Sequence, residues 1–117
     1  MHEFSLMASV LDMAAEELGR HGAHRLKLLR LRCGELDKVQ PEAMHLAFES
    51  MISGTDSEGA ILEITEEELV LRCPLCGHSF HPHDKSKMYC PCPACGGQTA
   101  FNVERGEGIF LDHLEAE

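Results

Sequence analysis

The sequence of 117 residues is poor in aromatic and basic side chains. It contains no Trp, one Tyr and five Phe, and its 10 Lys and Arg are outnumbered by 20 Asp and Glu. The few aromatics leave a mainly aliphatic core, sufficient for one domain with at most a small appendage. The net charge of −10 argues against nucleic acid as a partner, because affinity for phosphates depends on clustered Lys and Arg.

The sequence also lacks a long uninterrupted apolar stretch. The first residues, Met-His-Glu-Phe-Ser-Leu, contain no basic segment, and polar residues interrupt the apolar ones that follow. We therefore expect neither a signal peptide nor a membrane-spanning helix. The cysteines crowd into C-x2-C and C-x-C-x2-C patterns, which are typical of thiolates that bind metal in a reducing compartment. We expect a cytoplasmic protein.

Two amphipathic helices are predicted in the first half of the chain. From Glu3 to about Leu18, apolar residues recur at helical spacing, and glycines close the segment. A second helix is expected to begin at Pro41, because proline is favoured in the first turn of a helix, and to end at Gly54. The apolar stripe of this second helix consists of Met44, Ala47, Phe48, Met51 and Ile52.

Alternating apolar residues predict strands between and after these helices. Residues 26–33 have the two-residue period of a half-buried strand. Residues 60–71 indicate paired strands around a central acidic stretch, and residues 99–114 indicate one or two strands broken near Gly106 and Gly108. The intervening segment is rich in Cys, Pro, Gly and His, so it cannot form an apolar core by itself.

Two C-x2-C motifs in this intervening segment predict a zinc site made of four thiolates. A gap of fifteen residues separates the motifs, whose cysteines are Cys73, Cys76, Cys92 and Cys95. Because the protein would fill all four positions, this zinc would be structural and would supply folding energy that the segment lacks. An iron–sulfur cluster and a redox disulfide pair are the alternatives, and neither is favoured by the surrounding pattern.

Other cysteines and histidines have more than one interpretation. Cys90 could replace Cys92 through a C-x4-C spacing, although C-x2-C is the commoner arrangement. Cys33 is most simply a small buried hydrophobic residue. The zinc loop also contains three histidines, His78, His81 and His83. They could form a second metal site or a charge switch near neutral pH, but solvated loop histidines are the commoner case.

His2 offers a separate metal-binding possibility at the N-terminus. Its large side chain normally prevents removal of Met1, which fixes the position of the imidazole. An imidazole combined with nearby backbone nitrogens suits Ni(II) or Cu(II) better than zinc. The first amides of a helix have no intrahelical acceptor, so they are available to bind metal. The alternative is a terminal histidine without a metal role.

Several segments together resemble the HypA/HybF family: residues 1–6, 31–36, 41–43, 47–49, 54–55 and 58–60, and the paired C-x2-C motifs. The match covers essentially the whole chain, and the order and spacing of these pieces are specific. The resemblance implies a nickel metallochaperone for maturation of NiFe hydrogenases. It also implies an α+β fold in which two helices pack on a small mixed β-sheet, with an inserted zinc-ribbon domain.

The resemblance further implies two domains that bind different metals. Residues 1–71 together with 99–117 would form the nickel-binding α+β domain, and residues 72–98 would form the zinc ribbon. His2 would be the essential nickel ligand with Glu3 beside it, and the four cysteines of the C-x2-C motifs would bind zinc. Ni(II) would be cargo to be transferred, and Zn(II) would be structural.

The implied partners are a HypB-type GTPase and the hydrogenase large-subunit precursor, and some relatives also serve urease maturation. Whether the chain is a monomer or a homodimer stays open, since a short hinge around Leu71 and Gly97 would permit a swapped dimer.

Three features depart from the family pattern. Gln40 lies where several relatives have an acidic residue near the nickel, Cys90 is extra, and residues 106–109 enter the last strand more loosely.

No motif joins the serines and histidines into a catalytic constellation, so we do not expect an enzyme. The alternative to a metallochaperone is a zinc-ribbon protein-interaction module without nickel transfer. In that case zinc would organise a binding surface and His2 would be idle.

Overall fold

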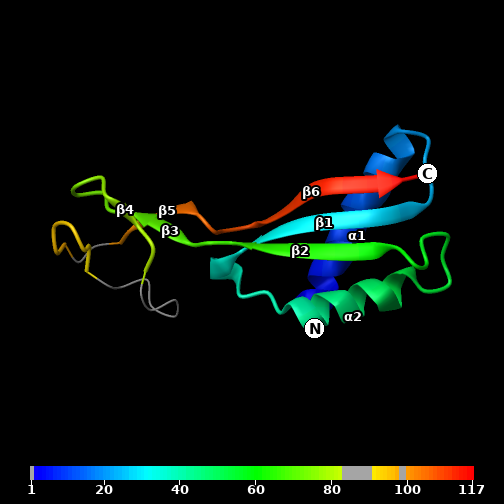
Figure 1. The fold of residues 1–117 in the computed structure, drawn as a ribbon, viewed down its shortest axis with the longest axis horizontal. Helices are drawn as coiled ribbons and strands as arrows, with labels where there is room; N and C mark the ends of the chain where they lie inside the picture. Colours follow the sequence, from blue (N-terminus) through cyan, green and yellow to red (C-terminus); the bar gives the residue numbers. More distant parts are fainter. Residues whose placement is uncertain (1, 83–90, 98–99) are drawn as a thin grey trace. The chain divides into compact units, whose positions relative to one another are not determined.

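The structure, a computed structural model, describes residues 2–82, 91–97 and 100–117. Its elements in chain order are α1 (His2–Arg20), β1 (Leu26–Gly34), the 3-10 turn η1 (Glu35–Asp37), α2 (Pro41–Ile52), β2 (Ile61–Glu67), β3 (Val70–Arg72), β4 (Ser79–Phe80), β5 (Asn102–Arg105) and β6 (Ile109–Ala116). The strands form two three-stranded sheets, in the orders β2-β1-β6 and β4-β3-β5 (Figure 1). The prediction of an α+β fold is confirmed.

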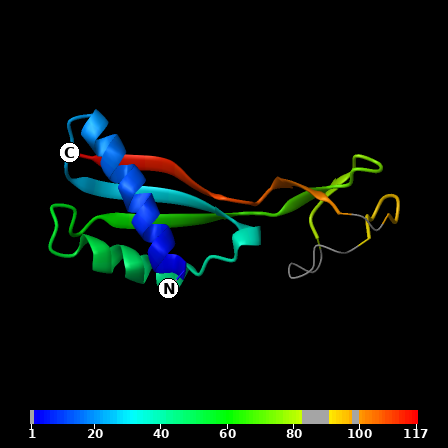
Figure 2. The same cartoon turned by 180° about the vertical axis from the view of Figure 1, so that it is seen from behind.

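The first helix covers one face of the sheet β2-β1-β6. It lies behind the strands in Figure 1 and crosses in front of them in Figure 2, which shows the opposite side. Its buried side chains recur every three or four residues, as the sequence predicts: Met7, Val10, Ala14 and Leu18. The central strand β1 contributes Leu29 and Leu31, which are fully buried. The sheet and this helix therefore share one aliphatic core.

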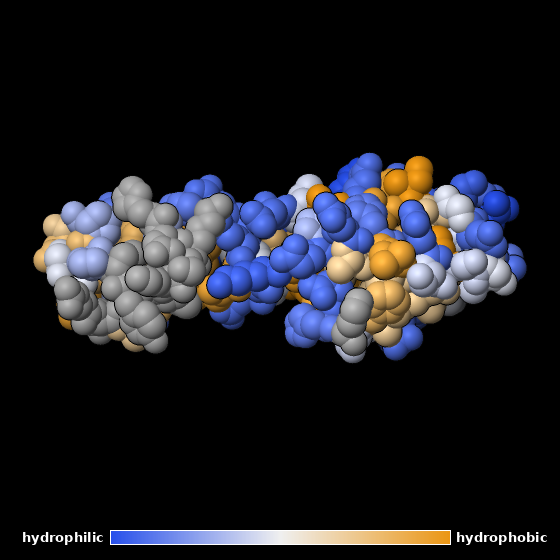
Figure 3. All heavy atoms as spheres, turned by 90° about the horizontal axis from the view of Figure 1, so that it is seen from below, coloured by the Kyte–Doolittle hydropathy of each residue, from blue (hydrophilic) through white to orange (hydrophobic). Residues whose placement is uncertain are grey.

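The second helix begins at the predicted proline. Pro41 occupies the first turn, where its missing N–H costs no intrahelical hydrogen bond. The last helical residue is Ile52, and Gly54 follows with a φ of 77°, a left-handed conformation that favours glycine. The buried residues of α2 are Met44, Ala47, Phe48 and Ile52. In Figure 3, hydrophobic atoms reach the surface among hydrophilic ones on the right-hand part, which holds α2.

The chain divides into two compact units. The first comprises Met1–Arg32, Val39–Thr65 and Phe110–Glu117, and the second comprises Cys33–Lys38 and Glu66–Ile109. The second unit includes the predicted ribbon segment 72–98 and extends beyond it on both sides. The second unit is larger because Leu69, Leu71 and Phe101, which lie outside residues 72–98, complete the core around the cysteines. Which unit holds nickel and which holds zinc stays a prediction.

The core of the second unit is built around two cysteines. Cys73 and Cys92 are buried together with Leu69, Leu71 and Phe101, and Leu36, Phe80 and Val103 pack against this cluster. In the sheet, Leu71 is paired with Phe80 on one side and with Val103 on the other, and both pairings are antiparallel. The rings of Phe80 and Phe101 meet edge to face, with centroids 5.2 Å apart.

Gly34 and Gly106 allow backbone segments of the second unit to approach closely. The amide of Gly34 donates to the carbonyl of Gly108 at 2.8 Å, and the amide of Leu36 donates to the carbonyl of Gly106 at 2.9 Å. A Cβ atom on Gly34 would overlap the backbone of Gly106. The predicted break of the last strand segment near Gly106 and Gly108 is therefore present, and it is a site of tight backbone contact. Among the described residues, no helix is long and apolar enough to cross a membrane.

Candidate metal centre

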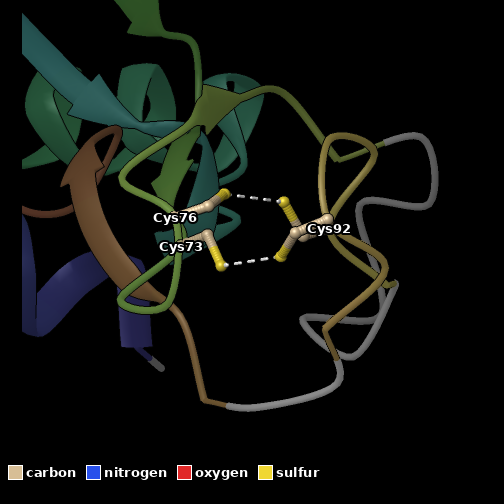
Figure 4. Close-up of side chains that lie close together, drawn as sticks. Cys73, Cys76 and Cys92 are labelled. Carbon is tan, nitrogen blue, oxygen red and sulfur yellow. Dashed lines mark hydrogen bonds between the residues drawn. The ribbon is translucent and has the colours of Figure 1, made fainter.

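The first cysteine pair lies in a tight knuckle that follows strand β3. The amide of Cys73 donates to the carbonyl of His78 at 2.9 Å, and the amide of Gly77 donates to the carbonyl of Cys73 at 2.8 Å. Gly77 has a φ of 78°, which residues with a Cβ rarely adopt. This turn brings the side chains of Cys73 and Cys76 to the same side of the loop (Figure 4).

The second cysteine pair repeats the same backbone pattern. The amide of Cys92 donates to the carbonyl of Gly97 at 3.0 Å, and the amide of Gly96 donates to the carbonyl of Cys92 at 2.8 Å. Gly96 has a φ of 73°, close to that of its counterpart in the first knuckle. The two C-x2-C-Gly sequences thus fold into equivalent knuckles, because the same spacing of cysteine and glycine allows the same turn.

The four sulfur atoms converge on one point. All of them lie within 4.8 Å of one another, and the Sγ–Sγ distances are 3.8 Å for Cys73–Cys95 and 3.6 Å for Cys76–Cys92. Figure 4 shows the sulfurs of the two knuckles pointing toward each other. A zinc ion with Zn–S bonds of about 2.3 Å in a tetrahedron requires sulfurs roughly 3.8 Å apart. The two Sγ–Sγ distances of 3.8 and 3.6 Å match this spacing, and the 4.8 Å limit keeps all four sulfurs close enough to ligate one ion.

The same distances bear on the alternatives to zinc. A disulfide bond requires sulfurs about 2.05 Å apart, so Cys73, Cys76, Cys92 and Cys95 are free thiols in this structure. Iron–sulfur clusters place bridging sulfide between several irons, and this requires more space than one ion does. Four thiols at tetrahedral spacing are consistent with the structural site that the sequence predicts.

Close packing shifts the pKa values of the Cys76, Cys92 and Cys95 thiols in the cluster. A hydrogen bond from the His78 backbone lowers the pKa of Cys76, but burial and the neighbouring thiols outweigh it and raise the pKa to about 12. The pKa of Cys95 is also raised, although the Gly97 backbone acts to lower it. At Cys92, burial raises the pKa, but hydrogen bonds from the backbone of residues 94 and 95 lower it to about 7. The raised pKa values of Cys76 and Cys95 favour their protonated forms, and a bound cation would favour the thiolates instead.

The other predicted metal-binding residues lie at the start of α1. His2 is the first described residue of the helix and is exposed, while Glu3 is partly buried in the first turn. The amide of Gln40, the residue that precedes α2, donates a long hydrogen bond of 3.4 Å to Oε2 of Glu3. The structure thus brings Glu3 beside the start of the second helix. Met1 lies outside the described residues.

The additional cysteines and histidines have separate environments. Cys33 is buried, as expected, and burial followed by the carboxylates of Asp37 and Glu66 raises its pKa. His78 is exposed and its ring stacks on Phe80, with centroids 6.1 Å apart. Cys90 and His83 lie outside the described residues.

His81 is partly exposed, but unlike a fully solvated loop histidine it has two carboxylates beside its ring. Its Nε2 atom lies 3.1 Å from Oε1 of Glu35, and 3.6 Å from Oε1 of Glu68. Glu35 is the charged residue that is buried in the described part of the chain, and its Oε1 also accepts a hydrogen bond from the amide of Leu69 at 2.8 Å. Sequence reasoning missed this pair because nothing in the local pattern marks Glu35 as buried.

Comparisons with known proteins place the chain in a family and agree with its fold. A family model described as "HypA: Hydrogenase/urease nickel incorporation, metallochaperone, hypA" matches residues 1–116. Among curated proteins, the hydrogenase maturation factor HypA of Lawsonia intracellularis is 40% identical over 118 residues and is covered completely, as is this chain. The corresponding factor of Solidesulfovibrio magneticus is 35% identical over 117 residues, again with complete coverage of both chains.

Two solved structures share the fold over nearly the whole length. The solution structure of the Ni metallochaperone HypA from Helicobacter pylori is 25% identical, covers 97% of this chain and 96% of its own, and has a TM-score of 0.68. A second structure, described as the solution structure of HypA protein, is 26% identical, covers 100% and 97% of the two chains, and has a TM-score of 0.72. These similarities extend across both compact units.

Proposed function

Because the chain belongs to the HypA family of hydrogenase and urease nickel-incorporation metallochaperones, we propose that it binds Ni(II) at its N-terminus. We further propose that it delivers this ion during maturation of a NiFe hydrogenase. The family consists of metallochaperones rather than catalytic enzymes, so nickel is cargo and no reaction is assigned to the chain.

The proposed nickel ligands are nitrogen atoms around His2. The imidazole and nearby backbone nitrogens can close fused chelate rings around one ion, and a nitrogen-rich set suits Ni(II). The observation that supports this site most directly is the start of α1. The helix begins at His2, so the amides of His2 and Glu3 have no intrahelical acceptor to lose.

Glu3 is proposed as a further nickel ligand or as a neighbour of the ion. Its carboxylate opposes the positive end of the helix dipole, which would otherwise repel a cation at this position. The long hydrogen bond from the Gln40 amide is weak enough for the carboxylate to turn toward a bound ion. Because amides and imidazole must lose protons, we expect binding to strengthen as the pH rises through neutrality.

Zinc is proposed to occupy the Cys73, Cys76, Cys92 and Cys95 cluster as a structural ion. The four thiolates would complete its coordination and leave no position for water or substrate. Two of these cysteines belong to the core of the second unit, so the ion would connect the two knuckles through that core. Residues 72–98 are proposed as the zinc ribbon, and residues 1–71 with 99–117 as the nickel-binding part.

Delivery requires partners that receive or help to transfer the ion. We propose a HypB-type GTPase and a hydrogenase large-subunit precursor, with urease maturation proteins as recipients in organisms that have urease. The proposed location is the cytoplasm, where these partners act. A monomer and a homodimer are both compatible with this role.

The alternative function is a zinc-ribbon interaction module that does not transfer nickel. It shares the four-cysteine site with the metallochaperone, so zinc binding cannot separate the two functions. They differ in what His2 does, since only the metallochaperone requires its imidazole to hold nickel.

The experiment is a nickel titration by isothermal calorimetry, run on zinc-loaded protein with a native N-terminus and no tag. We compare wild type with His2→Ala and with His24→Ala, a matched change at another exposed histidine. Zinc content is measured in parallel by elemental analysis. We expect His2→Ala to lose the nickel site while retaining zinc, and His24→Ala to behave as wild type.

Equal nickel affinity in wild type and His2→Ala would contradict the proposed site. Retained zinc without any nickel binding in wild type would favour the interaction module. Circular dichroism of each variant establishes that the helices remain folded.

A further inference from the structure

An apolar groove lies in the first unit, between α1 and the end of α2. Its volume is about 220 Å³, and it is lined by Leu11, Ala14, Ala15, Leu18, Leu26, Met51, Ile52, Thr55 and Ser57. Apart from the two hydroxyl groups, every lining side chain is apolar. Such a hollow is large enough to receive an aliphatic side chain from another molecule.

The two hydroxyl groups in the groove already have partners. Oγ1 of Thr55 donates to the carbonyl of Ile52 at 2.6 Å, and Oγ of Ser57 accepts a hydrogen bond from the amide of Leu26 at 3.0 Å. Because each oxygen already has a hydrogen-bond partner, an apolar occupant would leave neither of them unpaired. The groove therefore favours a hydrocarbon side chain over a polar ligand.

A second hollow adjoins the first and has an acidic lining. Its volume is about 430 Å³, Ile52 lines both hollows, and its remaining lining residues are Glu49, Ser53, Glu58, Gly59 and Ala60. Both charged residues in this set are glutamates. Oε2 of Glu58 accepts a hydrogen bond from the amide of Gly54 at 2.9 Å, which fixes one negative charge at the rim.

The two helices around the groove carry mainly negative charge. Their acidic residues are Glu3, Asp12, Glu16, Glu17, Glu42 and Glu49, and Arg20 is their single Lys or Arg. Arg20 itself contacts Glu16 at 3.3 Å and Glu17 at 2.6 Å. The helices therefore present a net negative surface to an approaching molecule.

We propose that this groove binds a positively charged amphipathic helix of a partner protein. An aliphatic side chain of that helix fills the apolar hollow, and Lys or Arg side chains on its flank meet Glu49 and Glu58. Helices that lay an apolar face into a groove are a common mode of recognition, and complementary charge sets orientation and association rate. A second copy of this chain does not fit, because both of its helices are acidic.

This proposal does not depend on nickel delivery, since none of the lining residues lies near His2 in the sequence or belongs to the cysteine cluster. A chain that failed to bind nickel would still possess the groove. Absence of peptide binding at the groove and absence of nickel binding at His2 are therefore separate results.

The probe for the test is a short fluorescent peptide of leucine and lysine, arranged to form an amphipathic helix. Its binding to full-length, zinc-loaded protein is measured by fluorescence anisotropy at physiological ionic strength. A peptide of the same composition in scrambled order is the control for charge attraction alone. We expect the amphipathic peptide to bind and the scrambled peptide to bind at least roughly tenfold more weakly.

Two pairs of variants locate the site. Ala15→Leu places a larger side chain in the groove, and Ala8→Leu makes the same change at an exposed position of α1 outside it. Glu49→Lys reverses a charge at the rim, and Glu42→Lys reverses one elsewhere on α2. We expect Ala15→Leu and Glu49→Lys to weaken binding roughly tenfold, and their controls to change it less than about twofold.

Three outcomes would overturn the proposal: no binding of the amphipathic peptide, equal binding of the scrambled peptide, or equal effects of a groove variant and its control. Equal effects of Glu49→Lys and Glu42→Lys would mean diffuse attraction to the acidic surface rather than docking. Circular dichroism is used to check that each variant retains its helices.

Discussion

The imidazole of His81 and the buried carboxylate of Glu35 face each other within the second unit, with Nε2 and Oε1 3.1 Å apart. The same carboxylate oxygen accepts the hydrogen bond from the Leu69 amide. Since a carboxylate can only accept, the ring nitrogen donates when Glu35 is ionised. This one side chain therefore joins the turn after β1 to the start of β3 and to the end of β4.

Replacing Glu35 should destabilise the second unit. Glu35→Ala leaves the buried Leu69 amide without its acceptor and removes the nearer of the two carboxylates beside His81, so we expect a loss of about 2–4 kcal/mol in the free energy of unfolding. Glu35→Gln keeps an acceptor oxygen and should cost less. Urea denaturation of the zinc-loaded protein measures both effects.

Glu68 provides the control for this prediction. Its Oε1 lies 3.6 Å from the same histidine nitrogen, but its side chain is 68% exposed. We therefore expect Glu68→Ala to cost under about 0.5 kcal/mol. If Glu35→Ala and Glu68→Ala unfold at the same urea concentration, burial of Glu35 is not what makes it important.

Gly106→Ala is expected to be strongly destabilising. Gly106 has a φ of 94°, and a Cβ atom there would overlap the backbone of Leu69. Strain and displaced backbone together should lower the free energy of unfolding by about 2–4 kcal/mol. Gly19→Ala is the matched control, because it lies in α1 with nothing within 4 Å of an added Cβ. The control should be neutral or more stable by about 0.5 kcal/mol, and a comparison of melting temperatures by circular dichroism distinguishes the two cases.

The helices, most strands and the cysteine cluster could be predicted from the sequence because their signals are local. Helical spacing placed Met7, Val10, Ala14 and Leu18 on one face, and these are the residues that α1 buries. The two C-x2-C motifs each form a knuckle from six consecutive residues, so their spacing carries the geometry with it. Such features depend little on the rest of the chain.

The interactions that escaped prediction join residues far apart in the sequence. Glu35 and His81 are 46 positions apart. Glu35 lies in η1 and His81 directly follows β4, and both elements have too few residues to show a period. The core of the second unit has the same character, since Leu69 and Phe101 complete a cluster around Cys73 and Cys92. The low aliphatic content of residues 72–98 indicates that other parts of the chain must complete the core, but it does not indicate which residues do so.

Cys33 should react slowly with alkylating agents in the folded protein. Burial and then the nearby carboxylates of Asp37 and Glu66 raise the pKa of its thiol, and the thiolate is the reactive form. The folded protein therefore holds less Cys33 thiolate at pH 8 than the unfolded chain does, and the reaction should accelerate as the pH rises toward the raised pKa. Iodoacetamide labelling followed by peptide mass spectrometry measures this residue separately from the other cysteines. Labelling of Cys33 at the same rate with and without urea would contradict the prediction.

Removal of one thiolate from the cluster should release zinc and unfold the second unit. Cys73 is both a proposed ligand and part of the buried core, so Cys73→Ala removes a metal bond and leaves a cavity. Structural zinc contributes about 10–16 kcal/mol in small zinc domains, more than the stability of a unit this size. We expect loss of zinc by elemental analysis and loss of dispersed amide NMR signals from the second unit. The helical circular dichroism should persist, because both helices belong to the first unit.

Cys33→Ala is the matched control for zinc loss, since Cys33 is another buried cysteine of the second unit but lies outside the four-sulfur cluster. It removes a sulfur of the same size and should retain one zinc ion per chain, at a cost of about 1 kcal/mol. A chelator added to wild type should reproduce the NMR spectrum of Cys73→Ala, because both treatments remove the same ion. If Cys73→Ala keeps zinc and a folded second unit, the ion is held by other residues. If the chelator removes zinc without altering the spectrum, the packing of Leu69, Leu71 and Phe101 is sufficient to fold this unit.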